Sequence, residues 1–314
     1  MAHYLVTGGA GFIGSNLAHA LVERGEKVRI LDNFATGRQE NIAQLVEQHK
    51  VELINGSITD AEVCARAVDG IDFVLHQAAI PSVPRSIDDP IGTNLVNVSG
   101  TLQLLRCAHK AKVKRLVFAA SSSAYGEKTP GQAKIETMSP DPLSPYAVQK
   151  LTCESYLRVF YTAYGLETVA LRYFNVFGAR QDPKSQYAAV IPNFVTAALA
   201  GRPATIFGDG ETSRDFCYIE NVIEANLLAC TAPKAAGEMM NIACGEATTL
   251  LQAVDVIGTI VGNKIAPKHE PTRAGDIKHS LASIDKAKKL LGYQGRIKFA
   301  EGIERTVAWY RKSQ

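Results

Sequence analysis

The segment 8–14 reads Gly-Gly-Ala-Gly-Phe-Ile-Gly and constrains the fold more than any other part of the chain. It follows a short apolar run at 3–7 and precedes an amphipathic stretch at 15–25 that ends in glycine. The first pattern predicts a buried parallel strand and the second predicts a helix. Another apolar run at 28–31 closes a βαβ unit. The chain therefore begins with the unit from which parallel sheets are built.

The glycines of this turn are expected to have separate roles. Gly8 allows a tight turn, Gly11 lets the backbone approach a pyrophosphate, and Gly14 lets the helix pack close to the strand. A pyrophosphate here would lie at the positive end of the helix, beside Phe12 and Ile13. A lone glycine triplet is often only a loop, but strand, turn and helix in this order predict a dinucleotide site.

Asp32 ends the second predicted strand and indicates which dinucleotide is bound. A carboxylate there accepts hydrogen bonds from the adenosine ribose and repels a 2′-phosphate, which favours NAD over NADP. Asn33 and Gly37 belong to the turn that follows and are assigned to the same site. The alternative is that Asp32 only caps this turn. Arg38 leaves NADP open, since a nearby arginine can bind a 2′-phosphate.

Two more predicted strands end at the same crevice. The strand at 53–58 should carry Ser57 and Ile58 to the adenine, and the strand at 73–79 should pass under the pyrophosphate. His76 in the latter strand is expected to be a packed residue and not a catalyst. The other residues assigned to the cofactor site are Gln77, Ala78, Ala79, Asn94, Tyr173 and Asn175.

Composition excludes several classes of protein. Of the 314 residues 46% are hydrophobic, enough for one large or two small packed units. The net charge is +3 without a basic run, so nucleic acid is not an implied partner. The six cysteines lack CxxC spacing and are typical of core residues in a reducing compartment, so we expect no disulfide and no metal. With no room for a signal peptide and no membrane-spanning run, we expect a soluble cytoplasmic protein with no membrane partner.

Strand and helix patterns alternate as far as the runs at 115–120 and 167–173. This predicts an α/β fold with a doubly wound parallel sheet of the Rossmann type. Beyond about residue 175 proline, glycine and aromatic residues become frequent, which predicts a smaller C-terminal substrate-binding lobe. The predicted division is 1–175 for the NAD-binding domain, 176–213 and 248–314 for the lobe, and 214–247 crossing back to the first domain.

Tyr146 and Lys150 lie four residues apart in a helix predicted from Pro145 to about Tyr164, and therefore share a face. A phenol has a pKa near ~10 and is a poor base at neutral pH. A neighbouring ammonium should lower that pKa, and a bound nicotinamide cation should add to the effect. Tyr146 could then take a proton from a sugar hydroxyl while hydride leaves the same carbon, with Lys150 also holding the nicotinamide ribose. The alternative is an ordinary amphipathic helix.

Ser121, Ser122 and Ser123 come directly after the predicted strand at 115–120. Hydroxyls at the carboxyl end of a parallel strand lie where ligands bind. One serine could bind the reacting oxygen and pass its proton to Tyr146, while the others position the substrate. The alternative is a polar exit from the strand that does no chemistry.

Motifs along essentially the whole chain carry a family resemblance. They are TGGAGFIGSNL at 7–17, LDNF at 31–34, HQAA at 76–79, SSSAYG at 121–126, SPYAVQK at 144–150, LRYFNVFG at 171–178, RDFCYIENV at 214–222 and RAGDIKHS at 273–280. With them the chain resembles the extended short-chain dehydrogenase/reductase family, and within it the nucleotide-sugar 4-epimerases. It is most similar to the UDP-N-acetylglucosamine 4-epimerases, which share QDP and YAAVIP within 181–192.

The resemblance also distinguishes among reactions. Related dehydratases carry Thr-Asp-Glu where this chain has Ser121–Ser123, and that acid pair eliminates water after oxidation. Related decarboxylases also use an acid in this segment. Without a carboxylate, a 4-keto sugar can only turn and take hydride back, which implies C4 epimerisation of a UDP-hexose with NAD as resident catalyst. In this register Ser121 is the catalytic hydroxyl, and Ser122 and Ser123 lie beside the sugar.

The resemblance assigns a second set of residues to the UDP-sugar. Arg214 and Arg273 are expected to clamp the pyrophosphate, a task suited to guanidinium groups, and Asp276 is expected to accept from a ribose hydroxyl. Without the resemblance both arginines would be interpreted as surface charge. The other assigned residues are Ser82, Val83, Ser123, Asn175, Ala189, Val190, Phe207 and Ser280.

The resemblance makes Ser280 the residue that sets substrate size. Epimerases restricted to plain sugars carry a tyrosine there, so a serine leaves space for an acetamido group. We expect both UDP-GlcNAc/UDP-GalNAc and UDP-Glc/UDP-Gal to be interconverted, with the acetamido pair favoured. The alternative is that Pro81, Ser82 or Ala189 sets the pocket. Two departures bear on binding: Ser57 stands where many relatives have Asp, and Pro81 where close relatives often have Gly.

Other functions stay open at this point. The chain could be a UDP-glucose/UDP-galactose 4-epimerase, a UDP-glucuronate 4-epimerase or a non-catalytic NAD-sensing scaffold, although scaffolds typically lose the tyrosine or the lysine. The resemblance also implies a homodimer with a four-helix interface built from helices near 96–111 and 148–164. Exposed apolar residues are expected on the second helix at Leu151, Tyr156, Val159 and Phe160.

Overall fold

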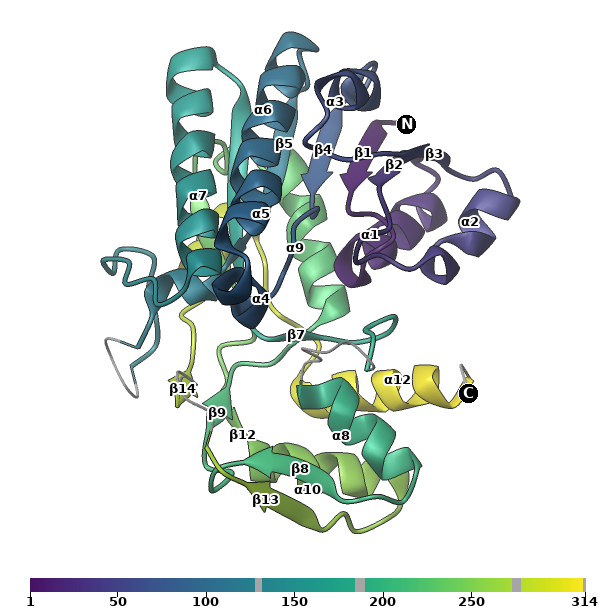
Figure 1. Cartoon of the computed structure of the whole chain (residues 1–314), viewed down its shortest axis with the longest axis vertical. Coiled ribbons are helices and arrows are strands. Elements are labelled where there is room, and N and C mark those ends of the chain that lie inside the picture. Colours follow the sequence, from purple (N-terminus) through teal and green to yellow (C-terminus); the bar gives the residue numbers. More distant parts are fainter. Residues whose placement is uncertain (128–131, 184–189, 273–277, 313–314) are drawn as a thin grey trace.

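A seven-stranded sheet forms the larger domain of the computed structural model, which describes residues 1–127, 132–183, 190–272 and 278–312 (Figure 1). All strands are parallel, in the order β11-β6-β5-β4-β1-β2-β3. They are β1 (His3–Thr7), β2 (Lys27–Asp32), β3 (Glu52–Asn55), β4 (Phe73–His76), β5 (Arg115–Ser121), β6 (Glu167–Tyr173) and β11 (Met239–Ile242). The order reverses between β1 and β4, where ligands bind in such sheets, so the predicted Rossmann-type α/β fold is confirmed.

Helices cover both faces of the sheet (Figure 1). One face packs against α1 and α9 through residues such as Leu17 and Val222, and the other against α3, α6 and α7 through residues such as Leu104 and Leu157. The helices of this domain are α1 (Phe12–Glu23), α2 (Ala43–Glu47), α3 (Ala61–Val68), α4 (Val83–Asp88), α5 (Pro90–Asn94), α6 (Thr101–Lys110), α7 (Pro145–Tyr164) and α9 (Ile219–Thr231). Two short 3-10 helices, η1 (Gln39–Asn41) and η3 (Ser122–Tyr125), and a π-helix, η2 (Leu95–Gly100), which joins α5 to α6, complete the helical elements of its described residues. Each face therefore has its own apolar core.

A smaller lobe lies below the carboxyl ends of the strands in Figure 1. Its strands pair as β7 (Val176–Phe177) with β10 (Cys217–Tyr218), β8 (Ala204–Phe207) with β13 (Pro267–Glu270), and β9 (Ser213–Arg214) with both β12 (Thr248–Thr249) and β14 (His279–Ser280). The remaining helices are α8 (Val190–Leu199), α10 (Leu250–Val261), α11 (Asp285–Leu291) and α12 (Phe299–Lys312). After α9 the chain returns to the main sheet, where β11 pairs with β6.

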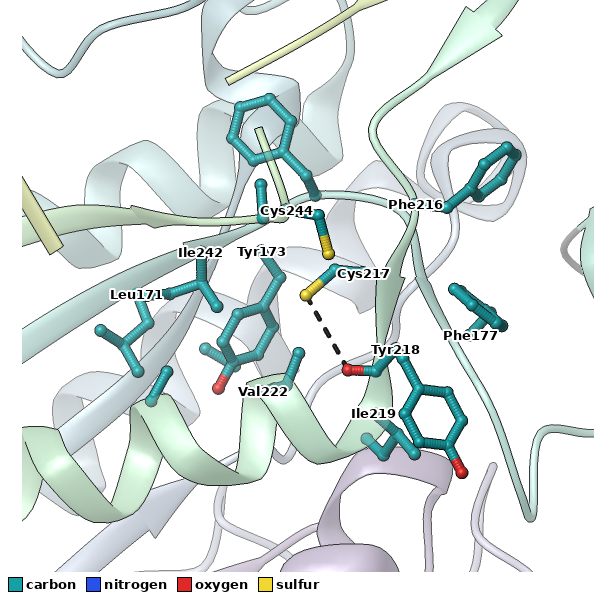
Figure 2. Packing of buried hydrophobic residues seen from close by; sticks show 14 of the residues in the cluster. Leu171, Tyr173, Phe177, Phe216, Cys217, Tyr218, Ile219, Val222, Ile242 and Cys244 are labelled. Atoms are coloured by element: carbon teal, nitrogen blue, oxygen red, sulfur yellow. Dashed lines mark hydrogen bonds between the residues drawn. The ribbon is translucent and has the colours of Figure 1, made fainter. Parts of the chain in front are cut away.

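The core continues from the sheet into the lobe (Figure 2). Leu171 and Ile242 come from neighbouring strands and Val222 from α9, while Phe177 and Phe216 meet edge to face with ring centres 6.3 Å apart. The sulfurs of Cys217 and Cys244 point toward one another in this core. All six cysteines are free and buried, as predicted.

Local sequence sets the ends of α7, which carries Tyr146. Ser144 precedes the helix, and its hydroxyl accepts a hydrogen bond from the N–H of Ala147 at 3.2 Å. Pro145 occupies the first helical position, where its fixed φ suits the helix and its missing N–H costs nothing. Gly165 ends the helix with a φ of 71°. The helix bounds agree with those predicted.

Three sequence predictions about packing differ from the structure. Phe160 was expected on the surface, but it is 6% exposed and stacks on Tyr164 with ring centres 4.6 Å apart. Leu151 and Tyr156 are half-buried, whereas Val159 is exposed as predicted. The strands predicted at 53–58 and 73–79 end earlier, at Asn55 and His76, because the residues that follow leave the sheet as crevice loops.

Within the described ranges no helix is long and apolar enough to cross a membrane. Among those same residues no cluster of histidine, cysteine, aspartate and glutamate could hold a metal ion.

Candidate active site

The turn between β1 and α1 has the shape that a pyrophosphate requires. Gly8 has a φ of +66°, and a Cβ there would lie 2.7 Å from the backbone nitrogen of Ala78. A Cβ on Gly14 would lie 2.1 Å from the carbonyl oxygen of Gly8, whereas one on Gly11 would meet only that oxygen, at 3.1 Å. No side chain caps α1 and no acid lies in its first turn. The first N–H groups of the helix, from Phe12 and Ile13, are therefore open to an anion.

Asp32 is buried and braces this turn. Its two carboxylate oxygens accept from the N–H groups of Ala10 at 2.9 Å and Phe34 at 2.8 Å. The capping role left open from the sequence is therefore present, and the carboxylate keeps further lone pairs for a ribose hydroxyl. Asn33 is exposed and accepts from the N–H of Ala35 at 3.2 Å. A Cβ on Gly37 would lie 2.8 Å from the Cβ of Ala10, so this turn packs directly on the glycine turn.

Arg38 lies between two carboxylates. Its guanidinium is 2.5 Å from an oxygen of Glu40 and 3.0 Å from an oxygen of Asp182. Because its charge is already paired with acids, Arg38 is a poor receptor for a 2′-phosphate. The glycine turn, the uncapped helix and the acidic surroundings fit NAD and do not favour NADP.

His76 is fully buried and links β1 to the η2–α6 helix. Its Nδ1 lies 2.7 Å from Thr7 Oγ1 and its Nε2 lies 2.9 Å from Thr101 Oγ1. Thr101 gives its hydroxyl hydrogen to the carbonyl of Asn97 at 2.6 Å, so Nε2 must carry the ring hydrogen. Burial, with a smaller effect from the charge of Lys150, lowers the pKa of His76 to about 3. His76 is thus a neutral packed residue, as predicted.

The loop after β4 is tied to β1 through its backbone and to α9 through the Gln77 side chain. Thr7 accepts from the N–H of Gln77 at its carbonyl, 3.1 Å away, and from that of Ala78 at its hydroxyl, 3.2 Å away. The Gln77 amide and the Tyr173 hydroxyl both meet buried Asn226, with Tyr173 Oη 3.1 Å from its Oδ1. The hydroxyl of Tyr173 therefore bonds to Asn226 of α9 and to Gln77 in the loop after β4.

The structure separates the remaining cofactor predictions. Ile58 is buried against Gly100, and a Cβ on that glycine would lie 2.8 Å from it. Ser57 bonds the hydroxyl of Thr59 at 2.8 Å. Asn94 is exposed at the end of α5, and no described contact brings it to the site. Of two further predicted residues, Ala79 is half-buried and Asn175 is exposed.

Tyr146 and Ser121 come together although they lie on different elements. The Ser121 hydroxyl at the end of β5 lies close enough to the Tyr146 phenol to lower the phenol pKa, but burial dominates and raises that pKa to about 12. Ser121 Oγ also accepts from the hydroxyl of Ser123 at 2.8 Å and from its N–H at 3.2 Å. Ser122 follows in the same short turn and is half-buried. The fold therefore brings Ser121 and Tyr146 close together, and the catalytic roles of the serines and the tyrosine stay predictions.

Lys150 lies on the helical turn after Tyr146 and faces the same strand. Its Nζ donates to the carbonyl of Ala119 at 2.7 Å and lies 4.6 Å from the centre of the Phe118 ring. Burial lowers the pKa of Lys150 to about 8. The sequence predicted that this ammonium lowers the pKa of Tyr146, but it is not among the causes of that shift. In the protein alone, desolvation of the phenol outweighs the neighbouring charge.

The predicted substrate residues are distributed over the larger domain and the lobe. Ser280 is 7% exposed on β14 and pairs in register with Arg214 on β9. The Arg214 guanidinium donates to the carbonyl oxygens of Ser213 at 3.0 Å and Lys278 at 3.2 Å. The opposite rim carries Ser82 and Val83 at the start of α4, while Val190 opens α8 and Phe207 ends β8. Ala189, Arg273 and Asp276 lie outside the described residues.

Sequence reasoning missed three buried polar residues beside the site. Asn97 bonds both backbone groups of Ile80, accepting from its N–H at 2.7 Å and donating to its carbonyl at 3.2 Å. It also donates to Gln149 on α7 at 2.8 Å. Ser86 on α4 accepts from the N–H of Tyr146 at 3.0 Å. Polar residues are common in these helices, so no sequence signal set these three apart.

The sequence matches a known protein family over most of its length. The model of the NAD dependent epimerase/dehydratase family matches residues 4–243. The chain belongs to this family. The predicted assignment to the extended short-chain nucleotide-sugar 4-epimerases is confirmed, and with it an NAD-dependent isomerase.

Individual relatives cover nearly the full chain. A UDP-glucose 4-epimerase of Mycolicibacterium smegmatis is 36% identical over 312 residues, 99% of each chain. The structure of a UDP-N-acetylglucosamine 4-epimerase from Methanobrevibacter ruminantium in complex with UDP-N-acetylmuramic acid has a TM-score of 0.92 at 38% identity, and covers 100% of this chain and 99% of that one. That of a UDP-glucose 4-epimerase from Thermotoga maritima with UDP-glucose has a TM-score of 0.93 at 38% identity, covering 99% of each chain. Overall similarity does not separate the two substrate classes.

Proposed function

We propose that this epimerase interconverts UDP-hexoses at C4 through a transient 4-keto sugar, with UDP-GlcNAc and UDP-GalNAc as the favoured pair and UDP-Glc and UDP-Gal also accepted. The observation that carries the proposal is the proximity of the Tyr146 phenol to Ser121, at a strand end that holds three hydroxyls and no carboxylate. A base and a hydroxyl suffice to move one proton. The strand end has no acid pair of the kind that eliminates water from the 4-keto sugar in dehydratases.

Each residue has a defined task in this reaction. Ser121 binds the oxygen on C4 and relays its proton to the Tyr146 phenolate, which returns the proton after the sugar has turned. Lys150 would hold the nicotinamide ribose. Bound NAD would supply a reversible hydride acceptor for C4, so that no net oxidation would occur. Arg214, with Arg273, holds the pyrophosphate of the substrate.

Support for the wider substrate range comes from Ser280. It is small and lies beside Arg214, so it occupies little of the space that a group on sugar C2 would need. The similarity to enzymes named for UDP-glucose and for UDP-N-acetylglucosamine is compatible with acceptance of both. Restriction to UDP-Glc and UDP-Gal is the second candidate, favoured by the relatives that carry that name.

We assign the cofactor and the substrate nucleotide to the two parts of the molecule. Residues 1–175 hold NAD, and the lobe of 176–213 and 248–314 holds the nucleotide of the substrate. We propose a homodimer through α7 and the adjoining η2–α6 helix, since apolar side chains lie exposed at Val148, Val159 and Leu95. Such residues on a monomer surface are typical of a covered interface.

One assay tests the proposal. The purified protein is incubated in parallel with UDP-Glc, UDP-GlcNAc and UDP-GlcA, without added cofactor, and the nucleotide sugars are separated by HPLC. We expect C4 epimers of the first two and faster conversion of UDP-GlcNAc. Conversion of UDP-Glc alone would support the second candidate, and conversion of UDP-GlcA alone would refute both.

A further inference from the structure

The backbone N–H of Tyr146 is bonded outside its own helix. The first N–H groups of a helix have no partner within it. In α7 the first residue, Pro145, has no N–H, and the third, Ala147, is capped by Ser144 at 3.2 Å. Tyr146 is left with a free donor, and it donates to the hydroxyl of Ser86 at 3.0 Å. The position of the catalytic tyrosine is thus tied to α4.

Ser86 is itself held in one orientation. It is fully buried, and it gives its hydroxyl hydrogen to the carbonyl of Val83 at 2.7 Å. Its own N–H donates to the carbonyl of Ser82 at 3.0 Å. Because the hydrogen points back into α4, a lone pair of the oxygen is directed at Tyr146. This contact joins the tyrosine to the segment that begins with Ser82 and Val83, the proposed sugar contacts.

We propose that Ser86 is a positioning residue of the epimerase: it sets where the Tyr146 phenol stands between the Ser121 hydroxyl and the sugar. The inference rests on the proposed function, in which Tyr146 moves the proton. Ser86 does not touch the reacting atoms, and it acts through the backbone of Tyr146. Misplacement of a catalytic group by about 1 Å can cost ~10²-fold in rate, so the loss of this bond should be visible in turnover.

A separate clamp keeps the rest of α7 in place. Asn97 donates to Gln149 at 2.8 Å and accepts from the N–H of Ile80 at 2.7 Å, joining the helix to the loop before α4. Gln149 also donates to Thr93 of α5 at 3.0 Å. Removal of the Ser86 hydroxyl should therefore release the first turn of α7 and leave the body of the helix docked.

The test compares Ser86→Ala with the control Thr168→Val. Thr168 is also buried, and its hydroxyl donates at 2.8 Å to the carbonyl of Leu157, near the other end of α7. Each variant loses one buried hydroxyl bond to α7, and Ser86→Ala also loses the bond to the Val83 carbonyl, so kcat is compared at a temperature at which both variants remain folded. We expect Ser86→Ala to lower kcat about tenfold or more with nearly unchanged KM, and Thr168→Val to keep kcat near that of wild type.

Hydrogen exchange supplies a readout independent of activity. In peptides that span the start of α7, the Tyr146 amide should exchange faster in Ser86→Ala and remain protected in Thr168→Val. Equal kcat values in the two variants, or unchanged exchange at Tyr146, would overturn the inference and leave Ser86 a structural residue.

A double variant separates this inference from the proposed function. If Ser86 acts through the phenol, Ser86→Ala should have no further effect on the residual first half-reaction of Tyr146→Phe, followed by absorbance of bound NADH. An undiminished effect in that background would refute the positioning role alone. Full turnover of Tyr146→Phe would instead refute the proposed function, on which the inference rests.

Discussion

The Nζ atom of Lys150 lies 5.8 Å from the centre of the Tyr146 ring, and its hydrogen bond goes to a backbone carbonyl and not to the phenol. Burial lowers the pKa of Lys150 to about 8 and raises that of Tyr146 to about 12. The four-residue spacing therefore places Lys150 on the same helix face as Tyr146, but it does not lower the pKa of the phenol as the sequence predicted. A further positive charge beside the phenol is needed, and the oxidised nicotinamide ring carries one.

Replacement of Tyr146 by phenylalanine should abolish nearly all turnover while the fold and bound NAD are kept, because only the hydroxyl is lost. The measurement is kcat for UDP-sugar epimerisation together with the NAD content of the purified protein. Tyr156→Phe, on the same helix but packed against the sheet core, is the matched control and should behave as wild type. A Tyr146→Phe variant with more than about a tenth of wild-type kcat would exclude Tyr146 as the base.

NAD should copurify with the protein, and no free NADH should accumulate during turnover. Hydride that leaves C4 returns to the same carbon, so the cofactor ends each cycle oxidised. Absorbance of the filtrate after ultrafiltration of a running reaction measures released NADH. Release in proportion to substrate consumed would identify a net dehydrogenase.

Ser280→Tyr should reduce turnover of acetamido sugars and spare plain sugars. Ser280 is nearly buried next to Arg214, so a ring at this position has to occupy the space beside the substrate. A single methylene-sized misfit discriminates by ~10–200-fold, and a ring should do at least as much. The ratio of kcat/KM for UDP-GalNAc and UDP-Gal measures the effect, with Ser280→Ala as the control that leaves the space open. An unchanged ratio in Ser280→Tyr would exclude Ser280 as the residue that sets substrate size and would leave Pro81, Ser82 or Ala189 as the candidates.

Acid should destabilise the protein in part through His76. The pKa of its imidazole is about 3 in the folded protein against 6.5 unfolded. The unfolded chain therefore binds more protons between these values, so this part of the stability is complete above pH 6.5 and is lost as the pH falls toward 3, by up to about 1.4 kcal/mol per pH unit.

Urea unfolding between those pH values can test this contribution. His76→Gln should be less stable than wild type near neutral pH, but should lose less on acidification. His49 is exposed and adopts a φ of 52°, which asparagine tolerates, so His49→Asn serves as control and should keep the wild-type pH dependence. Parallel curves for His76→Gln and wild type would contradict the assignment of a neutral buried imidazole.

The protein should be a dimer at micromolar concentration, and negative charge on α7 should dissociate it. Val148 is 49% exposed and Val159 is 47% exposed, and their spacing places them on one helix face. Light scattering of Val148→Asp/Val159→Asp should give the monomer mass, with unchanged mass for Thr259→Glu on the exposed side of α10. A wild-type protein that is monomeric under these conditions would refute the interface.

Local sequence alone determined the elements whose geometry depends on neighbouring residues. The glycines at 8–14 permit a turn that few other residues allow, and helical periodicity places Tyr146 and Lys150 on one face wherever the helix lies. Parallel strands bring their carboxyl ends to one edge, so Ser121 could be predicted near the cofactor turn. Because these features depend only on local sequence and on strand order, the fold and the family could be predicted from the sequence.

Only the tertiary structure decided contacts between segments far apart in the chain. Packing directs the Tyr173 hydroxyl to Asn226 and buries Asn97 while Asn94 faces solvent, although both asparagines have the same chemistry. Packing also brings Ser86 to the one unpaired N–H at the start of α7. These partners follow from how helices dock on the sheet, which depends on the shape of the whole core and not on any local pattern.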